Sequence, residues 1–361
     1  MEEKDVSKNG FLLVSKYRGA IMGIAALWIY VFHAWIILSP EPEKGGFNLI
    51  YLLAYYNKRL GYAGVDIFFL LSGIGLTFAI KKESTLKFYY KRIRRVALPA
   101  LTIGIIRGLV QDWGFIETLR IVSGFNFFTK TSYDFVWFVP AIVICYFFFP
   151  FYWKLFEKIS NKILFTAGAV IVWLAVTLLL RNVIRPDLFG FINRIPIFLI
   201  GILCGYLTQE RKNAVFTVRT YVMLASSLIS GLVLWYLVVI KEFNYLVPYG
   251  HCFIPTMLIA IGLTFLTAKL LDVIDRRLPR FGKVLSAILV FMGSVSLELY
   301  CVQWWFADMV PLLVEAGWPK YLVNISVFLM TTATAWVMSV LFKFFWELVE
   351  KPFSSKSAAE G

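Results

Sequence analysis

The sequence predicts an all-α protein, a polytopic bundle of about ten transmembrane helices with both termini in the cytoplasm. Hydrophobic residues make up 60% of the 361 residues and charged residues only 16%, a composition far from that of a soluble globular domain. Apolar stretches recur at lengths that suit a hydrocarbon core about 30 Å thick, which a helix of about 17 to 25 residues crosses. Basic residues gather between alternate stretches, as they do on the cytoplasmic side of membrane proteins.

The chain divides into a cytoplasmic segment (1–18), a membrane-embedded domain (19–353) and a polar C-terminal tail (354–361). The first segment has no long apolar core of a removable signal peptide, so the first apolar stretch is expected to remain as a helix. A separate interfacial piece is expected at 285–292. Spans are predicted at 19–38, 62–80, 96–110, 135–153, 163–180, 194–208, 218–240, 252–271, 291–314 and 322–346.

The net charge of +14 is interpreted as membrane topology and contact with anionic lipid rather than as nucleic-acid binding. With the N-terminus inside, each of the inside segments holds at least three Lys or Arg residues. An odd number of spans would break this alternation. No cluster of His and Cys has the spacing of metal ligands, so no metal site is predicted.

Two ionisable residues, His33 and Asp66, lie within the first two predicted spans. Such groups are costly in lipid and mark functional sites by default. Counting the helical rise from the outer ends places them roughly 7.5 and 6 Å below the outer surface. At a common depth on neighbouring helices, Asp66 is expected to hydrogen-bond to His33 and to orient it as a general base. The alternative is a packing hydrogen bond worth only about 1 kcal/mol.

A basic segment, LKFYYKRIRRVALP, follows the second span. It contains Lys91, Arg92, Arg94 and Arg95 beside aromatic residues. One interpretation is anchoring against anionic lipid. The other is a site for a polyphosphate ligand, because Arg side chains match phosphate geometry and aromatic faces suit a stacked base.

Further polar residues lie within or beside the spans. Those within the apolar stretches are Arg107, Arg194, Glu298 and Gln303, and such arginines could hold an anionic acceptor or pair with carboxylates. Gly73 and Gly75 are interpreted as helix-packing residues. Ser72 has no predicted base beside it, and His251 is interpreted as an interfacial polar residue.

Several segments resemble, in order, those of the acyltransferase type-three family of integral membrane proteins. GIAALWIYVFH and GYAGVDIFFLLSG are similar to its first two helices, and FYYKRIRRVALP to its basic stretch. Later similarities are VWFVPAIVICYFFFP, RIPIFLIGILCG, GSVSLELYCVQWW and ELVEKPF. Together these segments run from residue 18 to residue 353, nearly the whole chain.

The resemblance implies transfer of an acyl group, usually acetyl in this family, from cytoplasmic acyl-CoA to a hydroxyl of an extracytoplasmic glycan or lipid-linked sugar. His33 would be the essential histidine and Asp66 its partner. Lys91, Arg92, Arg94 and Arg95 would bind acetyl-CoA. The acceptor would contact Arg18, Trp137, Arg194, Glu298 and Gln303. The expected location is the plasma membrane of a bacterium.

Two positions depart from the family pattern. Met22 stands where the first helix usually has an arginine, eleven positions before the histidine, and Arg18 lies one turn away on the same face. Gln303 stands where a late helix often carries a histidine. The sequence therefore leaves two alternatives open: a catalytically inactive relative, and a proton-coupled transporter or flippase of a glycan or lipid-linked sugar, for which inverted repeats would be expected.

Overall fold

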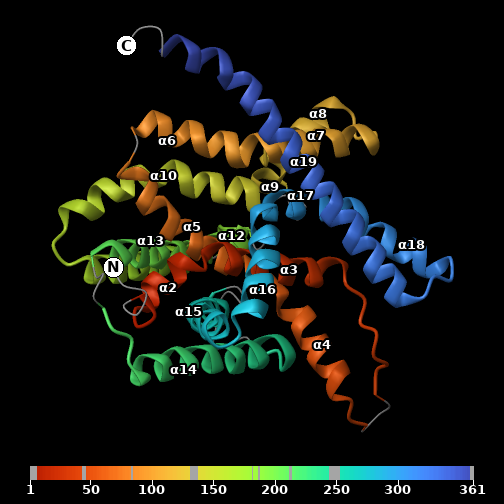
Figure 1. Ribbon diagram of the computed structural model, residues 1–361, viewed down its shortest axis with the longest axis horizontal. Helices are drawn as coiled ribbons and strands as arrows, with labels where there is room; N and C mark the ends of the chain where they lie inside the picture. Colours follow the sequence, from red (N-terminus) through yellow and green to blue (C-terminus); the bar gives the residue numbers. More distant parts are fainter. Residues whose placement is uncertain are drawn as a thin grey trace.

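The computed structural model describes residues 6–42, 46–82, 84–130, 137–180, 182–185, 188–210, 214–243 and 253–357. Every regular element within these ranges is a helix (Figure 1). The all-α fold class predicted from the sequence is therefore confirmed.

The first half of the chain forms α2 (Gly10–Lys16), α3 (Arg18–Ala34), α4 (Leu49–Leu60), η1 (Gly61–Ala63), α5 (Gly64–Ile80), α6 (Thr85–Arg92), η2 (Ile93–Ala97), α7 (Leu98–Val110), α8 (Phe115–Val122), α9 (Phe125–Thr129), α10 (Phe138–Lys158) and α11 (Lys162–Leu179). The second half forms α12 (Phe189–Ile192), α13 (Ile195–Glu210), α14 (Val218–Trp235), η4 (Tyr236–Ile240), α15 (Ile254–Arg277), α16 (Pro279–Ser294), α17 (Ser296–Ala307), α18 (Met309–Glu315) and α19 (Lys320–Ser357).

Eight helices in the described ranges are long and apolar enough to cross a membrane, or nine if the bent pair α2 and α3 counts as one span. The predicted span at 96–110 is not among them. There α7 has only 13 residues, and the helix that it continues carries the basic residues of α6 and η2. The expected interfacial piece at 285–292 lies inside the 16-residue helix α16.

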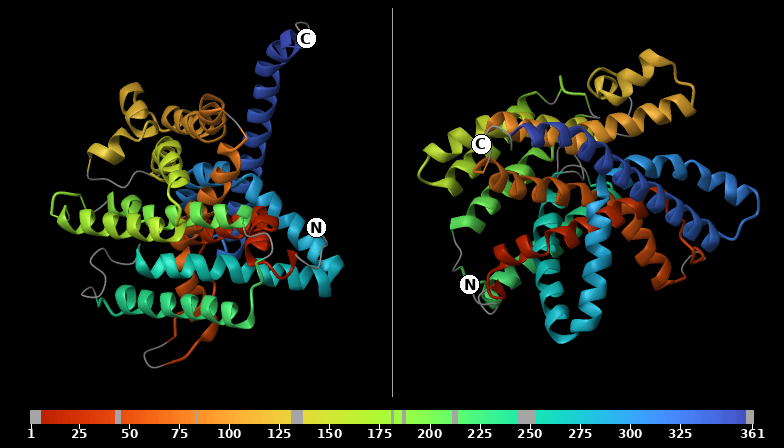
Figure 2. Two further views of the ribbon diagram at one scale, coloured as in Figure 1. Left: turned by 90° about the vertical axis from the view of Figure 1, so that its left-hand side faces the viewer. Right: turned by 45° about the horizontal axis from the view of Figure 1, so that its top comes forward.

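The centre of the bundle is formed by α3 and α5, with α13 packed against α5 and α16 against α3. Glycines permit these close approaches: a Cβ atom at Gly23 would lie 1.9 Å from the carbonyl oxygen of Leu289 on α16, and one at Gly73 would lie 2.5 Å from the carbonyl oxygen of Phe198 on α13. The interpretation of Gly73 as a packing residue is confirmed. Helices α14 and α15 lie side by side at the edge of this centre (Figure 2).

Helices α6 and α7 are joined end to end by the π-helical turn η2. Because a π-helical turn accommodates an extra residue, it changes the angle at which side chains leave the helix. Arg94 and Arg95 lie in this turn. Pro99 follows at the start of α7, where a missing backbone N–H costs little.

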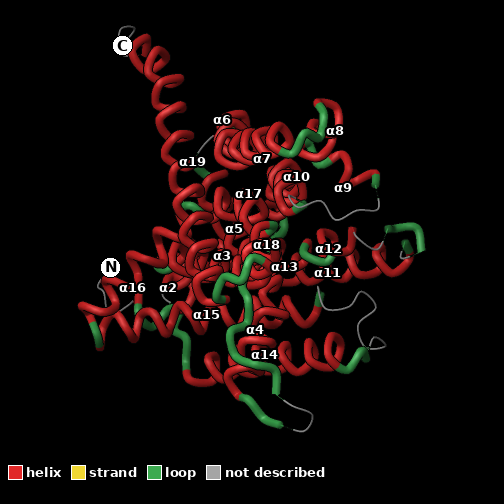
Figure 3. Tube along the Cα trace, turned by 90° about the vertical axis from the view of Figure 1, so that its right-hand side faces the viewer, coloured by secondary structure: helices red, strands yellow, loops and turns green. Residues whose placement is uncertain are grey.

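The long helix α19 extends past the bundle. Its C-terminal part projects beyond the other helices (Figure 3). On the way it passes α6 and η2, where Arg94 forms an ion pair with Glu350, and the guanidinium of Arg94 lies 5.0 Å from the ring centroid of Trp346. The end of α19 is therefore attached to the basic segment.

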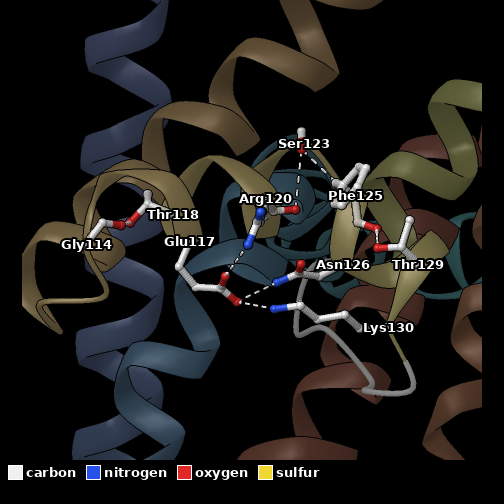
Figure 4. A network of polar contacts seen from close by, with 9 residues as sticks. All are labelled: Gly114, Glu117, Thr118, Arg120, Ser123, Phe125, Asn126, Thr129 and Lys130. Atoms are coloured by element: carbon white, nitrogen blue, oxygen red, sulfur yellow. Dashed lines mark hydrogen bonds and ion pairs between the residues drawn. The ribbon is translucent and has the colours of Figure 1, made fainter.

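A small polar network ties α8 to α9 at the surface (Figure 4). Glu117 Oε1 accepts hydrogen bonds from Asn126 Nδ2 at 2.8 Å and from Lys130 Nζ at 2.9 Å. Arg120 lies 3.9 Å from the other carboxylate oxygen. The hydrogen bonds from Lys130 and Asn126 hold the pKa of Glu117 below its usual range.

Acidification is expected to loosen this network. Because the folded state lowers the pKa of Glu117, its contribution to stability is complete above the unfolded value of about 4.3 and is lost as the pH falls through the lower folded value. Hydrogen exchange of residues 115–129, corrected for intrinsic rates, should show protection falling over that range. Glu117→Gln should reduce protection at neutral pH and remove the acid-dependent loss. An identical pH course in both proteins would contradict this prediction.

Candidate functional site

A cavity of about 720 Å³ opens between α3, α5, the α6–η2–α7 helix, α10, α17 and α19. Its size is in the range of cofactor and drug-sized sites. It is the place where the predicted basic segment meets the first helix. The charged and polar side chains among its lining residues are Arg18, Ser72, Lys91, Arg92, Arg94, Arg95, Tyr146, Ser294, Ser296, Glu298, Tyr300, Gln303, Ser339 and Lys343.

Three guanidinium groups face one another at the basic end of the cavity. Arg92 and Arg95 from the α6–η2 segment lie close enough to Arg18 on α3 for their charges to interact with it. Arg18 lies against the bare backbone of Gly75, where a Cβ atom would come within 2.5 Å of its Nη2. The Nε atoms of Arg18 and Arg92 are buried without a hydrogen-bond partner. Like charges at close range repel in a low dielectric, so this end suits an anion.

The remaining basic residues predicted for donor binding differ among themselves. Arg94 also lines the cavity, but its charge is paired with Glu350 and stacked on Trp346. Lys91 lines the cavity at its exposed edge. All four basic residues therefore line one cavity. They do not offer equal charge to a ligand, because Arg94 is already paired with Glu350.

The predicted hydrogen bond between His33 and Asp66 is not formed. Asp66 Oδ2 accepts from Arg194 Nε at 3.2 Å, and its Oδ1 accepts from Thr256 Oγ1 at 3.1 Å. Meanwhile His33 Nδ1 is buried without a partner. Asp66 is only 1% exposed, and a buried carboxylate requires a full opposite charge. A neutral imidazole cannot supply that charge as well as the guanidinium of Arg194 does.

The contact between Asp66 and Arg194 also corrects the expectation that Arg194 and Trp137 lie in the cavity. Arg194, predicted to bind the acceptor, is 2% exposed and bound to Asp66 and the carbonyl oxygen of Gly190. Trp137, predicted to stack in the cavity, instead has its ring centroid 5.1 Å from the guanidinium carbon of Arg194. Neither residue lines the cavity. Both belong to a buried polar cluster that joins α5, α10, α13 and α15.

His33 lies in the last turn of α3 and is not among the residues that line the cavity. Its ring centroid is 4.5 Å from that of Trp304 on α17. Gln303, the residue before Trp304, does line the cavity. Glu298, which the sequence assigns to acceptor binding, also lines the cavity and lies on α17 with Gln303.

The backbone after His33 is fixed from two helices. Asn324 on α19 accepts from Ile36 N at 2.8 Å and donates to Ile36 O at 2.8 Å, and Lys58 on α4 donates to Trp35 O. Sequence reasoning overlooked both residues. Asn324 stands among apolar neighbours, so the rule that flagged His33 and Asp66 would also have flagged it. Lys58 stands between Asn57 and Arg59, where that rule gives no signal.

The cavity also contains Ser72, to which the sequence assigns no role, and residues of α19 that no sequence pattern indicates. Tyr146 Oη lies 3.3 Å from Ser72 Oγ as its hydrogen-bond donor, and no base accompanies this serine. Lys343 and Trp346 come from α19, whose approach to the basic segment no local pattern indicates. Among the described residues, no group of three His, Cys, Asp or Glu side chains could hold a metal ion. His251 lies outside the described residues.

The described helices form a polytopic bundle with a cavity lined by basic residues, and comparison with protein families adds the class of protein. Residues 20–341 match the model of an acyltransferase domain. The chain therefore belongs to the acyltransferase 3 family and is a multi-pass membrane acyltransferase. No curated protein and no solved structure matches the chain.

Proposed function

We propose that the protein transfers an acyl group, in the simplest case acetyl, from acyl-CoA to a hydroxyl of an extracytoplasmic glycan or lipid-linked sugar in a bacterial plasma membrane. The observation that carries this proposal is the cavity that holds both the arginine group and Gln303 on α17, whose neighbour Trp304 packs against the ring of His33 at a centroid distance of 4.5 Å. Membership of the acyltransferase family supports the reaction class.

The donor's chemistry matches the two ends of the cavity. Coenzyme A carries phosphate groups at one end and the acyl thioester at the other. Arg18, Arg92 and Arg95 would bind the phosphates, for which guanidinium groups are well suited. The pantetheine arm would then follow the apolar wall, which includes Met22, toward the imidazole.

His33 would act as the general base. A ring nitrogen of the imidazole would accept the proton of the acceptor hydroxyl as that oxygen attacks the thioester carbon. The bond from this carbon to sulfur then breaks, and the departing thiolate takes the proton from the imidazolium. The products are an ester and free coenzyme A, and the imidazole returns to its neutral form.

Inside-out membrane vesicles from a bacterial host with and without the chain would test this reaction. Acetyl-CoA labelled in its acetyl group is added outside, where the cytoplasmic face is exposed. Label should enter the glycan fraction only with the chain present, and mild alkali should release it, as expected of an ester. Binding of acetyl-CoA without label transfer would indicate an inactive relative. Movement of an unlabelled glycan across the membrane without acetyl-CoA would favour a transporter or flippase.

Loss of a cavity arginine should weaken donor binding more than the chemical step. Arg92→Ala and Arg95→Ala are each expected to raise the apparent KM for acetyl-CoA about tenfold or more, because each removes a charge-assisted hydrogen bond worth about 1.5–3 kcal/mol. Arg94→Ala should have a smaller effect, since Glu350 already pairs with that charge.

The matched control is Arg120→Ala on α8, which removes an arginine that lies outside the cavity beside Glu117. Its apparent KM for acetyl-CoA should equal that of the unmodified protein. If Arg92→Ala behaves in the same way as Arg120→Ala, Arg92 has no part in donor binding, and the same holds for Arg95→Ala.

A further inference from the structure

Arg92 contacts two aromatic rings that come from different helices. Its guanidinium carbon lies 5.5 Å from the ring centroid of Phe88, one turn earlier on α6, and 6.0 Å from that of Tyr146 on α10. Both distances are within the range of a cation–π interaction. The charge of Arg92 is therefore attracted by a ring of its own helix and by a ring of a neighbouring helix, which together limit where the guanidinium can lie.

These aromatic contacts leave the hydrogen-bond donors of Arg92 available. The N–H groups of a guanidinium lie in its plane, whereas an aromatic face attracts the charge without supplying a strong acceptor. The Nε atom of Arg92 is buried and has no hydrogen-bond partner. Arg94 is the contrast, because its guanidinium lies 5.0 Å from the ring of Trp346 and is also paired with the carboxylate of Glu350.

The two rings are themselves fixed by packing and by a hydrogen bond. Phe88 is fully buried and stacks on Phe149 of α10, with the ring centroids 5.7 Å apart. Tyr146 lies three residues before Phe149, on the same face of α10. Its hydroxyl donates a hydrogen bond to Ser72 Oγ on α5 at 3.3 Å. Ser72, which has no base beside it, therefore holds a tyrosine that contacts an arginine.

One face of α5 contributes to the placement of two arginines. Ser72 and Gly75 are three residues apart, so they are neighbours on the surface of this helix. Ser72 binds the hydroxyl of Tyr146, the ring of which contacts Arg92. The missing side chain of Gly75 makes room for the guanidinium of Arg18. Because both arginines line the cavity, contacts that begin on α5 help to bring their charges together there.

We propose that Tyr146 is a positioning residue for Arg92: its ring, fixed by the hydrogen bond to Ser72, holds the guanidinium at the cavity and leaves its N–H groups to a phosphate of the donor. This inference rests on the proposed function, because the ligand is the phosphate end of acyl-CoA. A guanidinium held before the donor arrives loses less side-chain freedom when the donor binds. Tyr146 therefore acts on donor affinity and leaves the acyl-transfer step unchanged.

Binding of coenzyme A to the protein in lipid nanodiscs, measured by isothermal titration calorimetry, tests the inference without an acyl acceptor. Tyr146→Leu removes the ring and should raise the Kd about 5- to 30-fold, as expected for loss of a cation–π contact shielded from water. Tyr146→Phe and Ser72→Ala each remove only the hydrogen bond and should raise the Kd about two- to fivefold. The double variant should bind no more weakly than either single variant.

The dependence on Arg92 separates positioning from direct contact between Tyr146 and the ligand. In the Arg92→Ala background, Tyr146→Leu should cause no further loss of affinity, because the ring then has no charge to hold. A full additional loss would show that Tyr146 contacts coenzyme A itself, and it would overturn the inference.

The control is Tyr152→Leu, which removes another tyrosine of α10 that does not line the cavity. It should leave the Kd for coenzyme A unchanged. A Kd raised as much by Tyr152→Leu as by Tyr146→Leu would assign the effect to the packing of α10, and the inference would be wrong.

Kinetics supply a second measurement in vesicles that transfer label. Tyr146→Leu should raise the KM for acetyl-CoA by the same factor as the Kd and leave kcat within about twofold. If the unmodified protein binds coenzyme A and Tyr146→Leu binds it equally well, the inference fails and the proposed function stands. If the unmodified protein binds no coenzyme A, the proposed donor is wrong, and the inference fails with it.

Discussion

Replacement of His33 by alanine is expected to abolish acyl transfer while leaving the bundle folded. A positioned general base contributes about 10²- to 10⁴-fold to the rate. The initial rate of ester formation from labelled acetyl-CoA, at matched amounts of protein in vesicles, measures the loss. The affinity for acetyl-CoA should be unchanged, because the arginine group is untouched.

The control for this prediction is the other histidine. His251→Ala removes the same functional group from a part of the chain predicted to be interfacial, and it should retain the rate of the unmodified protein. Full activity in His33→Ala would exclude His33 as the base. A raised KM for acetyl-CoA with normal kcat would instead assign His33 to donor binding.

Replacement of Arg194 by methionine should produce the largest loss of stability. It leaves the carboxylate of Asp66 buried at 1% exposure without its counter-charge, and breaking a buried pair in this way costs about 3–5 kcal/mol. Thermal unfolding in lipid nanodiscs should show the change. The double variant Asp66→Asn with Arg194→Met should recover part of the loss, because it leaves no unpaired charge.

An exposed ion pair offers the matched comparison. Lys81→Met breaks the contact with Glu210, in which the two charges lie 3.7 Å apart and both side chains are more than one-third exposed. Such pairs are worth about 0–1 kcal/mol. If Arg194→Met is no more destabilising than Lys81→Met, the buried pair has no structural role. A double variant as unstable as Arg194→Met would also contradict the expected coupling.

Much of the fold follows from apolar length. The predicted spans at 163–180 and 218–240 correspond closely to α11 (Lys162–Leu179) and to α14 with η4 (Val218–Ile240). The exception at 96–110 has a physical cause. Residues 96–110 are apolar enough to be predicted as a span from hydropathy alone. They continue the basic helix α6–η2 without a break, and α7 by itself is too short to cross the membrane.

The sequence did not predict the direction in which the site side chains point. Helical rise predicts a similar depth for His33 and Asp66, but it gives no information on which way a side chain leaves its helix. Asp66 is bound by Arg194, which directly precedes α13, and by Thr256 on α15. Arg194 lies 128 residues along the chain from Asp66, and no local pattern joins the two.

The basic cluster was predictable as a group, and its internal differences were not. Charge and spacing indicated a phosphate site at Lys91, Arg92, Arg94 and Arg95. The pairing of Arg94 with Glu350 depends on the course of α19, a contact between residues 256 positions apart. The contribution of Arg18 depends on the missing side chain of Gly75. Both are consequences of tertiary packing.

The π-helical turn η2 makes the basic segment more sensitive to length than to composition. Arg92 and Arg95 reach the cavity from a helix whose continuation, α7, is fixed in the bundle by buried residues such as Ile103. Deleting one residue from η2 would rotate everything before it by about 100° and shift it by about 1.5 Å relative to α7. Every arginine would still be present in such a chain, but the group would face lipid or solvent instead of the ligand.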